Sequence, residues 1–179
     1  MRSYRDFISE AASRSLSRLH GHIERGHMVG FISASRGNLS PAENNKRTKE
    51  LKKSLKQHGY TPVPVKGEYI EDHNGAKKKV KEKSFMIHSG QTYASSLAKD
   101  PSAGHAIFLK NLKKHGEKFD QDTVLSVSKK HGSVFHGTGK SDWVPKGKRA
   151  RIGGAGISTN VGDFNTTLKR KKFIVGGGA

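Results

Sequence analysis

The excess of positive charge is the feature that most limits what this chain can fold into. Its 179 residues include 34 Lys and Arg against 15 Asp and Glu, a formal net charge of +19, and only 32% are hydrophobic. Like charges on one domain repel one another, and so few apolar residues allow only a modest core. We therefore expect one small folded domain with polar appendages and an anionic partner that offsets the charge.

Several classes of protein are excluded by what the sequence lacks. The absence of cysteine excludes disulfides, cysteine zinc sites and thiol nucleophiles. No apolar run approaches the roughly 20 residues that span a membrane, and no apolar signal segment follows the early arginines. The ten histidines show no spacing such as His-Glu-x-x-His. We expect no membrane partner, no metal and no cofactor.

The composition divides the chain into three parts. Residues 1–27 have apolar residues at helical spacing, which predicts an amphipathic helix ending near Gly21. Residues 28–136 are expected to form an α+β domain. Residues 137–179 are a basic region rich in Gly and Lys that ends in a last strand at 172–175.

The first long helix has a clear start signal. Ser40 caps the first amides, Pro41 fits the first turn and Glu43 closes a capping box. The helix is expected over 42–58, ending before Gly59. Its apolar positions are few, which indicates a surface helix with outward lysines.

A second long helix is expected at 104–119, with shorter helical segments at 91–99 and 162–168. The long helix has apolar residues at helical spacing, as a helix packed on a core requires. Its expected buried face consists of Ile107, Phe108, Leu109 and Leu112.

Strands are indicated by short apolar runs between turn residues. They are expected at 28–35, 60–70, 84–88, 123–127, 133–136 and 172–175. Pro62 and Pro64 indicate an edge or bulged strand, and Asn74-Gly75 marks a turn in a polar loop over 72–81. This order of elements predicts an α+β fold with a small mixed sheet and two main helices.

Clusters of Lys and Arg are the strongest functional signal in the sequence. Their side chains suit phosphate contacts, which position a protein on nucleic acid without reading its bases. No recognised base-reading module is visible. The residues expected to bind nucleic acid are Lys77, Lys78, Lys79, Lys146, Lys148, Arg149, Arg151, Lys169, Arg170, Lys171 and Lys172.

Two weaker patterns favour an enzyme. Residues 137–141 (Gly-Thr-Gly-Lys-Ser) resemble the end of a phosphate-binding loop, but Val134 stands where that loop needs its first glycine. Acidic and histidine side chains from the first helix and the next strands could converge on a divalent metal, as in nucleases. These are Glu43, Glu68, Glu71, Glu82 and His88. Because they have no fixed spacing, the catalytic residues stay unassigned.

The first eleven residues, Met-Arg-Ser-Tyr-Arg-Asp-Phe-Ile-Ser-Glu-Ala, resemble the capsid-targeting peptide of internal head proteins of T-even-type tailed bacteriophages. Those peptides have the form Met-Lys-x-Tyr-x-x-Phe-Ile-x-Glu-Ala, so Arg2 is a departure. The resemblance implies cleavage by the prohead protease after Glu10, read through Ile8 and followed by Ala11.

The body of the chain resembles the uncharacterised DUF3293 family. The resemblance covers roughly residues 28–127 and has no established activity attached to it. It is carried by Phe31-Ile-Ser-Ala, Glu43-Asn-Asn, Arg47, Gly59, Gly67, Glu68, Glu82-Lys-Ser84 and Gln121-Asp122.

These patterns together predict a basic, nucleic-acid-binding virion protein of a bacteriophage rather than an enzyme. It would contact the capsid or scaffold through residues 1–27, be packaged with DNA in the head and enter the host cytoplasm with the genome. One alternative is a small metal-dependent nuclease or another nucleic-acid-modifying enzyme. A second is a purely structural capsid or portal component.

Overall fold

The computed structural model describes residues 20–73, 76–91, 101–140, 144–151, 155–157, 164–168 and 171–175. The expected protease site at residues 8–11, Lys169 and Arg170, and nearly all of the helical segment expected at 91–99 lie outside these residues. Residues 20–24 are helical. The predicted end of the first helix near Gly21 is therefore a few residues too early.

The described elements alternate between strands and helices along the chain. The strands are β1 (Val29–Ser33), β2 (Val63–His73), β3 (Ala76–His88), β4 (Thr123–Ser128), β5 (Gly132–Gly137), β6 (Arg149–Arg151), β7 (Ala155–Ile157), β8 (Phe164–Leu168) and β9 (Lys171–Val175). The helices are α2 (Pro41–Gln57) and α4 (His105–Lys118), with short 3₁₀ turns at Ser89–Gln91 and Pro101–Gly104.

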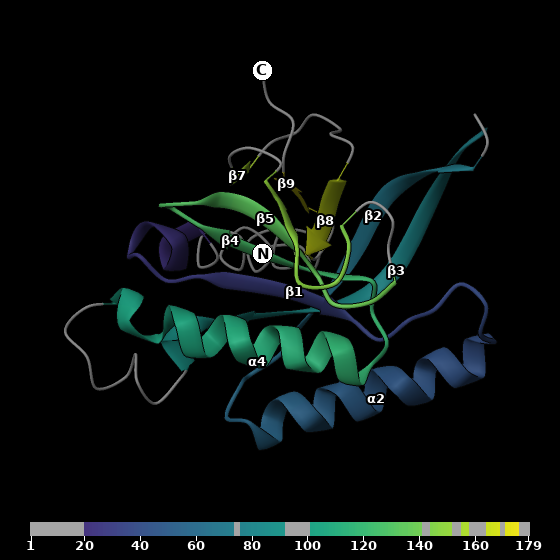
Figure 1. The fold of residues 1–179 in the computed structure, drawn as a ribbon, viewed down its shortest axis with the longest axis horizontal. Coiled ribbons are helices and arrows are strands. Elements are labelled where there is room, and N and C mark those ends of the chain that lie inside the picture. The colour runs from purple at the N-terminus through teal and green to yellow at the C-terminus, as the bar shows by residue number, and fades with distance from the viewer. Residues whose placement is uncertain are drawn as a thin grey trace, which may run out of the picture.

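All the described strands belong to one sheet in the order β6-β5-β4-β1-β3-β2-β8-β9-β7. The α+β class with two main helices is confirmed, but each described strand pair is antiparallel where a mixed sheet was expected. Both helices lie on the same side of the sheet (Figure 1). Strands from either side of the boundary expected between residues 136 and 137 share this sheet.

Helix α2 begins as its sequence predicts. The Ser40 side chain accepts from the Glu43 amide, and the Glu43 carboxylate accepts from the Ser40 amide, which completes the capping box. The helix ends at His58, and Gly59 follows with φ of +82°, a conformation that glycine adopts without a Cβ clash. This helix start and stop are encoded locally.

The sheet buries apolar side chains on both faces because successive residues of a strand point to opposite sides. Toward the helices, Ile32, Phe85 and Ile87 pack with residues of α2 and α4. These helix residues are Leu51, Leu55, Phe108 and Leu112. Val29, Phe31, Val65, Met86 and Val127 form a second cluster with Ile23 on the opposite face.

The predicted buried face of the second long helix is right only in part. Phe108 and Leu112 are fully buried and Leu109 packs against the core. Ile107 is 49% exposed, because its position on the helix points away from the sheet. Helical spacing alone therefore placed this residue on the wrong side.

Strand β2 lies inside the sheet, between β3 and β8, and is not the edge strand that its prolines indicated. Pro64 pairs with Phe85 of β3, whereas the pairing with β8 begins only at Lys66. Pro64 therefore lies where β2 has a neighbour on one side, which tolerates its missing amide proton. β2 therefore has a paired strand on both sides at Lys66–Tyr69 but on only one side at Pro64.

Two expected irregular or helical segments are strands. Most of the polar loop expected over 72–81 is instead paired strand. The pairing of β2 with β3 continues through Asp72 with Lys77 and ends at His73 with Ala76. The short helix expected at 162–168 is wrong, because Phe164–Leu168 is β8. In both places, pairing with a neighbouring strand overrides a polar local sequence.

Candidate active site

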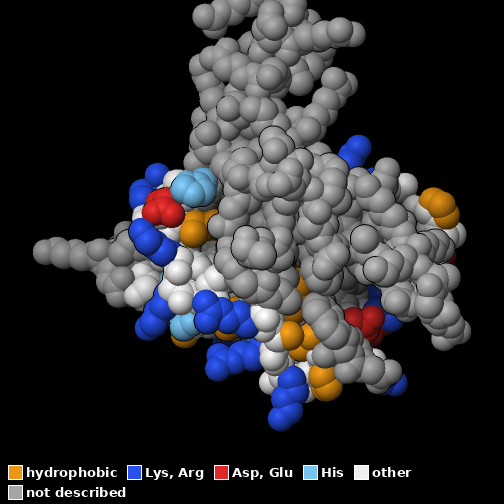
Figure 2. Space-filling view, turned by 90° about the horizontal axis from the view of Figure 1, so that it is seen from above, with side chains coloured by type: hydrophobic (Ala, Val, Ile, Leu, Met, Phe, Trp, Pro, Cys, Tyr) orange, Lys and Arg blue, Asp and Glu red, His pale blue; other side chains and the backbone are white. Residues whose placement is uncertain are grey.

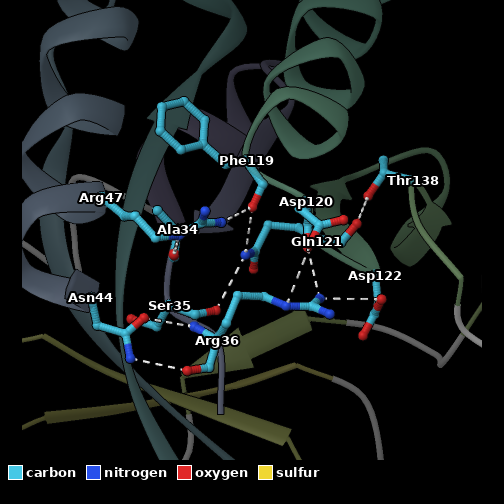
Figure 3. Close-up of polar contacts among 10 residues, drawn as sticks. All are labelled: Ala34, Ser35, Arg36, Asn44, Arg47, Phe119, Asp120, Gln121, Asp122 and Thr138. Atoms are coloured by element: carbon cyan, nitrogen blue, oxygen red, sulfur yellow. Dashed lines mark hydrogen bonds and ion pairs between the residues drawn. The ribbon is translucent and has the colours of Figure 1, made fainter. Parts of the chain in front are cut away.

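The main chain is held by side chains where it leaves β1 (Figure 3). Arg47 of α2 donates from Nε to the Ala34 carbonyl at 2.8 Å and from Nη2 to the Phe119 carbonyl just after α4. One guanidinium thus joins β1, α2 and the end of α4. Its planar fork of donors suits two carbonyls at once.

A second arginine ties the same turn to the start of β4. Arg36 Nη1 donates to the Asp120 carbonyl at 2.7 Å and lies 3.3 Å from Asp122 Oδ1. The backbone of Arg36 is fixed in turn by Asn44, whose Oδ1 accepts from the Arg36 amide and whose Nδ2 donates to the Arg36 carbonyl. Both the backbone and the guanidinium of Arg36 are therefore held by polar contacts.

Gln121 completes the network between these elements. Its Nε2 donates to the Ser35 carbonyl at 3.2 Å and to the Phe119 carbonyl at 3.3 Å. Its own carbonyl accepts from the Thr138 hydroxyl at 2.6 Å. These side chains satisfy main-chain groups of the protein itself, so we interpret the network as a frame for the end of β1.

The frame leads directly to β3 through one buried serine. The Ser33 hydroxyl accepts from the Ser35 amide at 3.0 Å and donates to the Lys83 carbonyl at 2.9 Å. Lys83 is held on the helix side as well, because its Nζ donates to Asn45 Oδ1 at 2.8 Å. The residue on one side of Lys83 is Glu82.

Glu82 lies on the face of the sheet opposite the helices. Alternation along β3 places it on the same side as Ser84 and Met86, and Met86 belongs to the cluster on that face. The side chain is half-buried, and Ser84 Oγ lies 3.5 Å from Glu82 Oε1. Gly67 stands opposite Glu82 on β2, so the residue paired with Glu82 has no side chain.

The other carboxylates whose side chains the structure describes lie outside the strands of the sheet. Glu24 pairs with Lys129 at 2.9 Å, Glu117 with Lys146 at 3.6 Å, and Asp122 with Arg36. Glu43 is used by the helix cap. Among the side chains that the structure describes, Glu82 is the one carboxylate carried by the central sheet.

The five residues expected to converge on a metal do not all meet. Glu43 is in the first turn of α2, and His88 is six residues along β3 from Glu82, about 20 Å at the usual strand rise. Glu68 and Glu71 are on β2, opposite Lys81 and Lys78. Within the described residues there is no group of three or more His, Asp or Glu that could hold a metal ion.

The phosphate-loop resemblance at residues 137–141 has no structural support. The amides of Gly137, Thr138 and Gly139 donate to the carbonyls of Lys148 and Asp122. A phosphate-binding loop needs such amides free to face the phosphate. Here these amides connect the end of β5 to the residue before β4 and to the turn before β6.

The expected nucleic-acid-binding residues are spread along the sheet. Lys146, Lys148, Arg149 and Arg151 lie exposed at or before the edge strand β6, whereas Lys77–Lys79 are on β3, four strands away. Lys171 and Lys172 are on β9, toward the other edge. On the face shown in Figure 2, Lys and Arg side chains of the described residues lie singly or in small groups around the outline.

Arg36, Arg47 and Gln121 were not predicted as site residues, because nothing local reveals what a polar side chain contacts. The one available signal was Ser33, a polar residue that ends an apolar run.

Across the described residues, no helix is both long and apolar enough to span a bilayer. The expected capsid contact of residues 1–27 and the location of the protein stay predictions.

Comparison with known proteins gives one family. Residues 30–172 match the sequence model of the S-adenosylmethionine lyase family. A solved structure, a phage S-adenosylmethionine lyase in complex with S-methyl-5'-thioadenosine, is similar at 20% identity over 64% of this chain and 82% of that chain, with a TM-score of 0.33. No curated protein sequence matches the chain.

The family match overturns three expectations at once. A lyase family is a family of enzymes, so the prediction of a non-enzymatic basic virion protein that binds nucleic acid is wrong. The family match also replaces the resemblances to internal head proteins and to the DUF3293 family. The match covers well over half of the sequence, and the chain belongs to the S-adenosylmethionine lyase family.

Proposed function

We propose that this chain cleaves S-adenosylmethionine between the sulfonium sulfur and the γ-carbon of the methionine moiety. The observation that carries the proposal is the family match over residues 30–172, which includes the whole frame around β1 and β3. The nucleoside product would be S-methyl-5'-thioadenosine, the molecule named with the similar phage structure.

The substrate can supply its own nucleophile for this reaction. Its carboxylate attacks the γ-carbon, a C–O bond forms, the C–S bond breaks and its electron pair stays on sulfur. The products are the neutral thioether and homoserine lactone, with no proton, water or co-reactant consumed. Closing a five-membered ring within one bound molecule gains from proximity, so the protein has chiefly to hold the substrate in the reactive shape.

Glu82 is the residue that we propose for holding the substrate. S-adenosylmethionine carries an ammonium group and a sulfonium, and the chain has a net charge of +19, so a cationic substrate needs a local anion. A carboxylate can accept hydrogen bonds from the ammonium group but not from the sulfonium, which has no N–H or O–H donor. Binding at the ammonium orients the neighbouring carboxylate for attack.

The surroundings of Glu82 strengthen such a contact. Ser84, Val65 and Met86 are buried on the same face of the sheet, and charge-assisted hydrogen bonds are stronger where water is excluded. The attack also joins a carboxylate to a sulfonium carbon and so removes both charges. A site of low polarity favours that loss of charge over the solvated reactants.

The test is incubation of the purified protein with S-adenosylmethionine and mass spectrometry of the products. We expect S-methyl-5'-thioadenosine and homoserine lactone, with no heavy oxygen in the lactone when the reaction is run briefly in heavy-oxygen water. Glu82→Gln should lower kcat/KM by about 10- to 100-fold, the loss expected for a hydrogen bond to a charged group. Glu50→Gln on the exposed face of α2 is the matched control.

Two outcomes would contradict the proposal at different levels. Unchanged S-adenosylmethionine would remove the activity itself. Full activity of Glu82→Gln alongside Glu50→Gln would keep the activity and remove the assigned role of Glu82.

A further inference from the structure

We propose that Ser33 is a positioning residue for Glu82 and acts through the peptide at Lys83. This inference rests on the proposed function, in which the Glu82 carboxylate holds the substrate. The structural observation is that one buried hydroxyl joins the end of β1 to the residue between Glu82 and Ser84.

The direction of each hydrogen bond at Ser33 is fixed by its partners. The Ser35 amide can only donate, so the Ser33 oxygen accepts there at 3.0 Å. The Lys83 carbonyl can only accept, so the single Ser33 proton is used there at 2.9 Å. Ser33 is 5% exposed, and little water is at hand to replace either bond.

This contact takes over where backbone pairing ends. The register of β1 with β3 closes at Ser33 opposite Ser84, and β1 then turns away toward α2. Glu82 still faces Gly67 of β2, but β1 has no paired residue beside it. The Ser33 hydroxyl therefore extends the attachment of β3 to β1 by one residue, to the carbonyl of Lys83, the residue next to Glu82.

The frame described above explains why Ser33 itself stays in place. Gln121 holds the Ser35 carbonyl and Arg47 holds the Ala34 carbonyl. The two residues after Ser33 are thus fixed to α2 and to the segment after α4. A rigid Ser33 transmits that rigidity to β3, and a misplacement of about 1 Å can reduce catalysis by as much as 100-fold.

The polar character of Ser33 is hard to explain by packing alone. The rest of β1 is Val-Gly-Phe-Ile, fully buried, where a valine at position 33 would satisfy strand propensity and burial. A buried hydroxyl lowers stability unless it is hydrogen-bonded. The two hydrogen bonds of Ser33 offset that cost, and one of them fixes the carbonyl of Lys83, the residue next to Glu82.

The decisive comparison is Ser33→Thr with Ser33→Val. The two side chains have nearly the same shape and both favour strands, so they differ in the hydroxyl and not in the fold. We expect Ser33→Thr to stay within about 3-fold of the parent kcat/KM and Ser33→Val to fall at least about 10-fold, a loss within the range for misplacement of reacting groups. Ser35→Ala is the control, because the backbone of Ser35 forms the contacts given above.

A double-variant cycle separates positioning from a general loss of structure. If Ser33 acts through Glu82, adding Ser33→Val to Glu82→Gln should cause little further loss, because coupled residues are not additive. Melting temperatures of all variants check that the fold is kept. A shift of the pH dependence of kcat/KM in Ser33→Val, absent from Ser33→Thr, would further support an altered Glu82 environment.

The possible failures are distinguishable. Equal activity of Ser33→Thr and Ser33→Val, or full additivity with Glu82→Gln, would overturn the role of Ser33 while leaving that of Glu82 intact. An active Glu82→Gln would overturn the role of Glu82 and, with it, this inference.

Discussion

The imidazole rings of His22 and His88 stack with their centroids 3.8 Å apart and their planes inclined by 23°. His27 lies close to both, at 5.8 and 6.0 Å, and Arg25 donates to His22 Nδ1 at 3.2 Å. Three imidazoles and a guanidinium thus gather where residues 20–27 meet the end of β3. Neutral imidazoles can pack together in this way, whereas protonating them would bring like charges close to one another and to Arg25.

The first prediction is a loss of stability on acidification. Burial first, and then the charges of His22, His27 and Arg25, lower the pKa of His88 to about 4. Burial also lowers the pKa of His22 and His27. Because the unfolded chain takes up protons from its ordinary pKa of about 6.5 downward, stability is present above that pH and is lost as the pH falls toward 4.

Thermal melts between about pH 7 and 4.5 check this. We expect the melting temperature to fall by roughly 5 °C or more across that range, as a loss of one to two kcal/mol would give. His88→Phe should reduce the fall, and His131→Phe on the exposed turn after β4 is the control. The same pH dependence in parent and His88→Phe would contradict the assignment.

The second prediction concerns Arg47. Replacing it with Lys removes one of its two contacts to the Ala34 and Phe119 carbonyls, because an ammonium cannot reach both as a planar fork does. We expect a loss of about 1.5–3 kcal/mol in the free energy of unfolding, typical for a hydrogen bond to a charged group. Denaturant titration measures it, with Lys49→Ala on the exposed side of α2 as the control. A change below about 0.5 kcal/mol, the size usual for a surface substitution, would show that Arg47 is dispensable.

The third prediction concerns Gly137. A Cβ at this position would collide with the carbonyl oxygens of Val144 and Pro145, which are main-chain atoms and cannot rotate away. Gly137→Ala should therefore lower the free energy of unfolding by about 1–3 kcal/mol or more. At Gly37 a Cβ would meet nothing within 4 Å, so Gly37→Ala is the matched control. Similar denaturation midpoints for the two variants would refute the close approach.

The fourth prediction concerns the start of α2. Ser40→Ala removes the side chain that accepts from the Glu43 amide at 3.3 Å and should lower stability by about 1 kcal/mol. Ser40→Thr keeps the hydroxyl, which accepts from the Glu43 amide and donates to Glu43 Oε2, and should recover most of that loss. Chemical denaturation measures both variants, and equal stability of the two would show that the capping box contributes nothing.

Local sequence accounts for the elements whose signals are short-range. The cap at Ser40, the stop at Gly59 and the expected turn at residues 74–75, bracketed by the pair of His73 and Ala76, follow from preferences acting over a few residues. The same kind of reasoning missed β6, β7 and β8. Those strands have polar or glycine-rich sequences and exist because a neighbour pairs with them.

The candidate site could be anticipated only as a set of residue types. Glu82 was one of five candidate acid or base residues, and the sequence offered no reason to separate it from Glu43 or His88. Charge clusters suggested a nucleic-acid surface, yet charge at scattered positions says nothing about which side chains share a face. A family match, not a pattern of lysines, corrected that interpretation.

The sequence by itself determined the charge, the α+β class, the bounds of α2 and α4 to within a residue, and the apolar run that forms β1. Only the tertiary structure decided that β1 lies between β3 and β4, and so that Ser33 reaches Lys83, fifty residues away in the chain. The physical reason is the distance along the chain over which each interaction acts. Caps, turns and periodicity act between near neighbours, whereas strand order and a shared hydrogen bond depend on how the whole core packs.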